Sequence, residues 1–166
     1  MLESNRFQDF KTLTNVCEMK MTEKKEEEIS VLKEIIASLQ TNLNMATIAA
    51  VAHLKKINQP IEEFGLLYGE LGAKTWEEDM TLEQVVKNVE RIMTNFGAKV
   101  ESVDIKKDEG TIVIKDYPNI ELLKAAQITR DDFERIYNVW QPIIEKQKLQ
   151  YSVKTEEESI TMSIKK

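Results

Sequence analysis

The sequence of 166 residues contains one cysteine and one histidine, so most catalytic and metal-binding devices lack their usual residues. A lone Cys17 cannot form an internal disulfide, and nothing in the cysteine count points to an oxidising compartment. Neither a Cys-x-x-Cys pair nor a His-Glu-x-x-His pair is present, which excludes the common zinc motifs. We therefore expect no metal site and no cofactor.

Long hydrophobic runs and positive charge are also scarce. The most apolar stretch, residues 45–54, is about ten residues long, whereas a bilayer span needs about twenty. The first residues lack the apolar core of a signal peptide. A net charge of −6 argues against nucleic-acid binding, which needs a basic face. These absences predict a soluble, cytoplasmic protein with no membrane span and no nucleic-acid partner.

The length suits one domain with an arm. We expect a peripheral N-terminal arm or helix over residues 1–28, in which apolar residues recur at spacings of three or four. Residues 20–28 carry mixed charge, which is typical of a solvated helix or linker, or of an arm that packs on a second subunit. Residues 29–166 are then expected to form a single α+β domain of ligand-binding type.

Helical spacing continues into the first part of this domain. Leu32, Ile36 and Leu39 belong to an apolar stripe that begins near Ile29, and asparagines at 42 and 44 could interrupt it. Residues 45–54 are apolar on nearly every side, which predicts a helix buried all round, with His53 at its edge or in the core. Further helices are expected over 60–78 and over 81–96, the second opened by a capping box.

Three glycines, Gly65, Gly69 and Gly72, lie in the predicted helix 60–78. Each costs up to about 1 kcal/mol in a helix interior. Their presence indicates that something approaches this helix closely. Either another helix or a ligand would meet that description.

After residue 97 the apolar pattern changes to a period of two. Residues 98–105 and 111–116 predict one hairpin, and residues 149–154 and 160–165 predict another. Between them we expect a short helix over 119–127 and a longer one from Thr129, which Pro142 must kink or end. The order predicts an α+β fold, with N-terminal helices packed on one face of a roughly four-stranded antiparallel sheet made of two hairpins.

Aromatic residues gather on two of the predicted helices. Phe64 and Tyr68 lie on one, and Tyr137 and Trp140 lie on the other. Two interpretations stay open, namely packing within the core and an apolar pocket in which Tyr68 or Tyr137 supplies a polar contact. Acidic pairs in the sequence are adjacent, so they point about 100° apart on a helix and make no acid–base pair.

Two stretches resemble a known family. Residues 64–72, FGLLYGELG, are similar to the glycine-bearing helix of the vinyl-reductase-type small-molecule-binding domain, and residues 111–119, TIVIKDYPN, resemble its second strand. Heme nitric-oxide sensors and a vesicle-tethering complex subunit share that fold. The resemblance implies a small-molecule-binding or assembly module, often dimeric. Tyr117 replaces a cysteine that holds zinc in some relatives, and the heme-binding motif is missing.

The leading hypothesis is a non-catalytic domain that binds or senses a small, largely apolar ligand. Its predicted ligand-binding residues are Phe64, Tyr68, Tyr137, Trp140 and His53. The alternative is a dimeric protein-interaction or assembly module, in which helices of two copies bury an apolar face. A second alternative is a small hydrolase-like enzyme on a related fold, for which His53 or carboxylates would supply the base.

Overall fold

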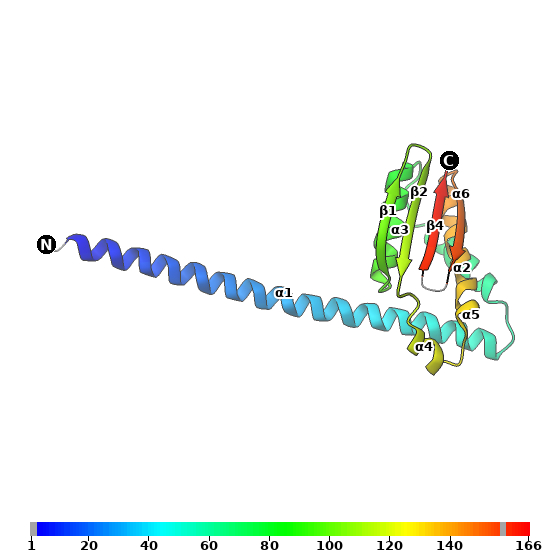
Figure 1. Cartoon of the computed structure of the whole chain (residues 1–166), viewed down its shortest axis with the longest axis horizontal. Coiled ribbons are helices and arrows are strands. Elements are labelled where there is room, and N and C mark those ends of the chain that lie inside the picture. The colour runs from blue at the N-terminus through cyan, green and yellow to red at the C-terminus, as the bar shows by residue number, and fades with distance from the viewer. Residues whose placement is uncertain (1–2, 157–158) are drawn as a thin grey trace. The chain divides into compact units, whose positions relative to one another are not determined.

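The computed structural model describes residues 3–156 and 159–166, and it describes side chains from residue 24 onward outside that gap (Figure 1). The predictions about Cys17 and about the apolar side chains of the arm therefore fall outside the described side chains. Contacts divide the chain into two compact units, residues 1–39 and residues 40–166. The sequence-based division was placed after residue 28.

Helix α1 spans Glu3–Lys56 without a break, through both asparagines that were expected to interrupt it. Asparagine weakens a helix when its side chain hydrogen-bonds to nearby backbone groups. Asn44 does not do so, because its side chain is buried and its Oδ1 atom has no hydrogen-bond partner. The helical ladder therefore continues undisturbed past this residue.

Only one face of α1 is buried in the 40–166 unit. Ile48 and Val51 belong to the hydrophobic core, whereas Met45 and His53 are exposed. The prediction that residues 45–54 form a helix buried all round is therefore wrong, and so is a core position for His53. The apolar composition of residues 45–54 suggested burial on every side, whereas the rest of the domain packs against only one side of the helix.

The sheet consists of β1 (Lys99–Ile105), β2 (Glu109–Lys115), β3 (Gln150–Thr155) and β4 (Ser159–Lys165). Its order is β1-β2-β4-β3 with all pairs antiparallel, so β2 and β4 join the two predicted hairpins. The register pairs Ile112 with Met162 and Ile114 with Ile160, all of them fully buried. The structure confirms the predicted α+β class.

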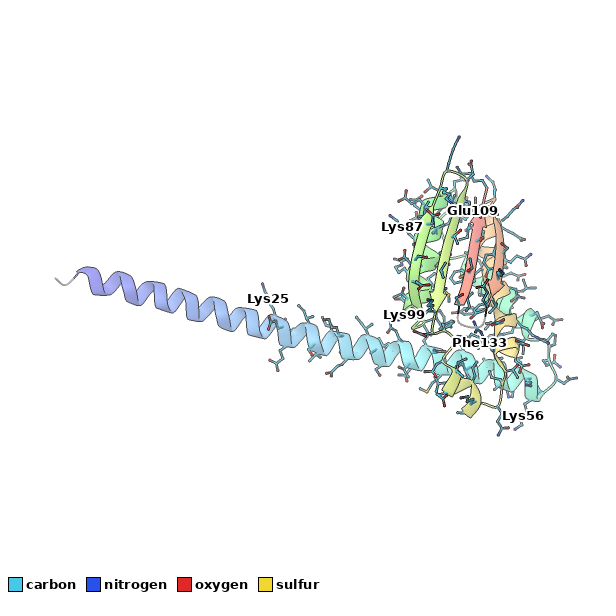
Figure 2. All side chains as sticks on the ribbon, in the orientation of Figure 1. Lys25, Lys56, Lys87, Lys99, Glu109 and Phe133 are labelled. Carbon is cyan, nitrogen blue, oxygen red and sulfur yellow. The ribbon has the colours of Figure 1, made fainter. Side chains whose placement is uncertain are left out.

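Helices α3 (Leu82–Asn95) and α6 (Trp140–Lys146) pack on the buried face of this sheet (Figure 1). The predicted capping box is present at the start of α3, where the Thr81 hydroxyl accepts from the backbone of Gln84 and the Gln84 side chain accepts from the backbone of Thr81. Val86 fits closely over Gly110 of β2, because a Cβ on that glycine would overlap its Cγ2 atom. Phe133, labelled in Figure 2, is fully buried in the same core.

The remaining helices are α2 (Ile61–Ala73), α4 (Ile120–Ala125), α5 (Arg130–Glu134) and the 3₁₀ helix η1 (Arg135–Val139). The single helix expected from Thr129 is thus divided into α5, η1 and α6. Pro142 does not kink it but lies in the first turn of α6, where a missing backbone N–H leaves no hydrogen bond unmade.

An ion pair joins the end of α1 to α5 and gives a pH-dependent prediction. Burial would raise the pKa of Asp132, but hydrogen bonds from Lys55 and Thr129 lower it to about 2 from 3.8. The ionised carboxylate stabilises the fold fully at pH values above the pKa of Asp132 in the unfolded chain. This stabilisation is lost as the pH falls through the lower pKa of the folded state. Acidification from about pH 6 to pH 3 is expected to cost about 1 kcal/mol more in the wild type than in Asp132→Asn. Urea unfolding of both proteins at both pH values measures this difference. Equal losses of stability in the wild type and in Asp132→Asn would contradict the prediction.

Candidate functional site

A cavity of about 500 Å³ lies between the helices of the 40–166 unit. This volume is within the range of small-molecule sites, about 300–1,000 Å³. Helices α1, α2, α3, η1 and α6 all contribute to its wall. The lining residues are Leu43, Ala46, Thr47, Ala50, Phe64, Tyr68, Gly72, Thr75, Trp76, Ile92, Met93, Phe96, Tyr117, Ile136, Tyr137, Val139, Trp140 and Ile143.

The structure brings together four of the five predicted ligand-binding residues. Phe64 and Tyr68 of α2 line the cavity, and so do Tyr137 of η1 and Trp140 of α6. His53 is not among the lining residues, and its side chain is exposed. Tyr137 and Trp140 also belong to the buried core, so the aromatic residues both pack in the core and line a cavity. Ligand binding in this cavity stays a prediction.

The aromatic residues differ in exposure, which distinguishes the mouth of the cavity from its interior. The rings of Phe64 and Tyr68 stack with centroids 6.4 Å apart and planes 14° apart, and Tyr68 is 51% exposed. Tyr137 and Trp140 are buried, and the ring of Phe133 packs edge-on against Tyr137 at 6.1 Å. Tyr68 therefore stands at the solvent side and Tyr137 at the buried side.

Gly65 and Gly69 of α2 are explained by a neighbouring helix rather than by a ligand. A Cβ on Gly65 would overlap Oδ1 of Asn138, and a Cβ on Gly69 would overlap the carbonyl oxygen of Val139. The Asn138 side chain also donates from Nδ2 to the carbonyl oxygen of Glu62 at 2.7 Å. The two glycines thus let η1 lie directly against α2, which sets the position of Tyr137.

Helix α6 holds the segment that follows α2. Lys146 Nζ donates to the carbonyl oxygens of Ala73 at 2.9 Å and Trp76 at 2.8 Å, and Gln147 Nε2 donates to that of Glu77 at 2.8 Å. The first bond satisfies the carbonyl of Ala73, the last residue of α2, and the other two hold the segment that follows. The helix therefore ends at Ala73, earlier than the predicted residue 78. They also place Trp76 in the cavity wall.

The cavity wall is largely apolar, since no charged side chain lines it in the described part of the chain. Two lining threonines use their hydroxyls within their own segments. Thr47 Oγ1 donates to the carbonyl oxygen of Leu43 at 3.0 Å, and Thr75 Oγ1 donates to that of Gly72 at 2.7 Å. Tyr137 differs, because its hydroxyl is buried and has no hydrogen-bond partner among the described residues.

The environment of Tyr137 keeps its phenol neutral. Burial raises the pKa of Tyr137 well above its usual value, and the nearby Tyr117 and Glu134 raise it further. The hydroxyl therefore keeps its proton at neutral pH and can either donate or accept a hydrogen bond. A buried hydroxyl without a partner is costly, so a polar group of a ligand that reached it would be favoured.

Sequence reasoning did not find the contributions of α1 and α3 to the wall. Ala46 and Ala50 of α1 and Ile92 and Phe96 of α3 all line the cavity. The pair on α1 is spaced four residues apart, and small residues at this spacing leave room beside a helix. That signal was present in the sequence, but it also fits ordinary helix packing.

By length and composition alone, one described helical segment, Lys24–Lys56, passes a criterion for crossing a membrane, with a mean hydropathy of 1.3 in its most apolar window. Ile48 and Val51 of this segment lie in the domain core, where apolar side chains have a structural role. Among the described residues no three His, Cys, Asp or Glu side chains gather closely enough to hold a metal ion.

Comparison with models of known protein families gives no match, and comparison with curated proteins gives none either.

Proposed function

We propose that the 40–166 unit binds one small, uncharged and largely apolar molecule in the interhelical cavity. The observation that supports this most is the cavity itself, because seven aromatic residues line it and no charged side chain of the described residues does. The resemblance to the vinyl-reductase-type small-molecule-binding domain agrees with this proposal. A largely apolar site with a few polar groups is typical of ligand pockets.

Burial of the ligand supplies most of the proposed affinity. A molecule that loses about 300 Å² of apolar surface to the wall gains roughly 7 kcal/mol. That gain, before the cost of immobilising the ligand, corresponds to an affinity between about millimolar and micromolar. A hydrogen bond to the Tyr137 hydroxyl adds about 1 kcal/mol and orients the ligand.

A screen of small molecules tests the proposal. We expect a class of lipid or apolar metabolite to raise the melting temperature of the full chain, because a ligand at 100 times its dissociation constant adds about 2.7 kcal/mol of stability. Charged analogues of the same size serve as controls and are expected to have little effect. No shift from any apolar compound would contradict the proposal.

Tyr137→Phe separates the roles of the ring and the hydroxyl. Without ligand, the variant is expected to be as stable as the wild type or up to about 1 kcal/mol more stable, because it removes a buried hydroxyl that lacks a partner. Affinity for a ligand that carries a polar group is expected to fall about fivefold, since one hydrogen bond is lost. Urea unfolding and ligand titration measure the two effects. A loss of several kcal/mol without ligand would show that the hydroxyl is already satisfied.

A second candidate function, assembly as a homodimer, is favoured by apolar side chains that are exposed on helices. Leu67 and Leu71 of α2 are each more than half exposed, and so are several residues of α1. For the hydrolase-like alternative, His53 was one of two candidate bases, and its exposed position outside the cavity wall does not favour that role.

A further inference from the structure

Residues 24–39 of α1 carry an apolar stripe with nothing packed on it. All side chains of this segment are exposed, and Figure 2 shows them standing out around the helix from Lys25 onward. The exposed apolar residues include Ile29, Leu32, Ile36 and Leu39, with exposed fractions between 51% and 61%. A helix usually gains most of its stability by packing an apolar face, so this stripe calls for a partner.

Part of the stripe has the spacing of a coiled-coil seam, and Ile35, which is 49% exposed, lies directly beside that seam. Ile29, Leu32, Ile36 and Leu39 are separated by three, four and three residues, which places them at heptad positions a, d, a and d. Isoleucine at a with leucine at d favours two parallel strands. The same phase continues in the sequence with Leu43 at the next a position.

Charges beside the stripe support a second copy in parallel register. Glu28 occupies a g position and Lys33 the following e position, and in a parallel pair each g residue faces the e residue of the partner five positions later. The pair would therefore place opposite charges together twice, once on each side. Within one chain, Lys24 and Glu28 approach to only 4.0 Å, and both side chains are well exposed. Their ion pair is therefore weak and leaves Glu28 able to pair with Lys33 of a second copy.

We propose that two copies of this chain pair in parallel and in register through residues 29–39 of α1. The proposal rests on the second candidate function, dimeric assembly, and goes beyond the ligand proposal, which concerns other residues. A second copy satisfies both features of the segment, because the stripe is complementary to itself and the flanking charges are complementary across the pair.

Light scattering and sedimentation of the full chain test the pairing. Leu32→Glu combined with Leu39→Glu places four carboxylates in the proposed seam and is expected to weaken dimerisation at least about 100-fold. Val31→Glu is the matched control, because Val31 is an exposed apolar neighbour at position c, outside the seam. It is expected to dimerise like the wild type. Circular dichroism confirms that each variant keeps its fold.

A disulfide test fixes the orientation. With Cys17→Ser as background, Leu39→Cys is expected to cross-link two copies, since d positions of the same number face each other only in a parallel, in-register pair. If the variant with both glutamates still dimerises, or if Leu39→Cys never cross-links two copies, the proposed pairing is overturned while dimeric assembly still stands. A wild type that is monomeric at every concentration would overturn both. Monomers that bind phosphatidylcholine–phosphatidylglycerol vesicles through this stripe would overturn the pairing in favour of a lipid surface.

Discussion

Gly69→Ala is expected to lower the free energy of unfolding by about 2–3 kcal/mol. The added Cβ would overlap the carbonyl oxygen of Val139, which is a backbone atom of η1 and cannot rotate away as a side chain can. Overpacking of this kind costs about 1–3 kcal/mol, with larger values where the neighbour is fixed. Alanine gains up to about 1 kcal/mol of helix propensity, which offsets only part of the cost. Urea denaturation measures the difference.

Gly72→Ala is the matched control on the same helix. Its Cβ would lie 3.2 Å from Cδ1 of Ile143, the end of a flexible side chain that can shift by a few tenths of an ångström. We expect its stability to stay within about 1 kcal/mol of the wild type, because this small crowding opposes the propensity gain. If Gly69→Ala were as stable as Gly72→Ala, η1 would not lie against α2 as described.

Ala50→Trp is expected to weaken ligand binding at least about 100-fold, which corresponds to about 2.7 kcal/mol. Ala50 lies on α1 in the cavity wall, and an indole there takes space that the ligand would otherwise fill. The fold is expected to remain intact, because the side chain enters an existing cavity rather than a packed core. Titration of the best compound from the thermal screen measures the loss.

Ala49→Trp is the control for this substitution. Ala49 is the adjacent residue on the same helix, but it is exposed and does not line the cavity. It is therefore expected to bind the ligand with wild-type affinity. Equal affinity in both tryptophan variants would place the ligand elsewhere on the protein.

The sheet and the capped helix could be predicted from the sequence because their signals are local. Alternating residues such as Ile112 and Ile114 mark a face of β2, and Thr81 with Gln84 marks the start of α3. The extent of α1 could not be predicted in this way. Whether Asn44 breaks a helix depends on whether its side chain bonds to the backbone or is buried, which the tertiary structure decides.

The candidate site was predictable in part. The aromatic residues of α2, η1 and α6 indicated a shared environment, and the structure places Phe64, Tyr137 and Trp140 in one wall. His53 was misplaced because its apolar neighbours suggested burial, although only one flank of α1 packs on the core. The glycines left two explanations open, and only the approach of η1 at Val139 distinguishes a helix from a ligand.

Native mass spectrometry of the full chain, purified without denaturant, tests the central claim most directly. The account predicts that the wild type and Ala49→Trp retain one small molecule per chain and that Ala50→Trp retains none. Release under collision should yield an uncharged, largely apolar compound that fits a cavity of about 500 Å³. A wild type that carries no added mass after incubation with the compound selected by thermal screening, or an Ala50→Trp variant that carries the same mass, would contradict the account.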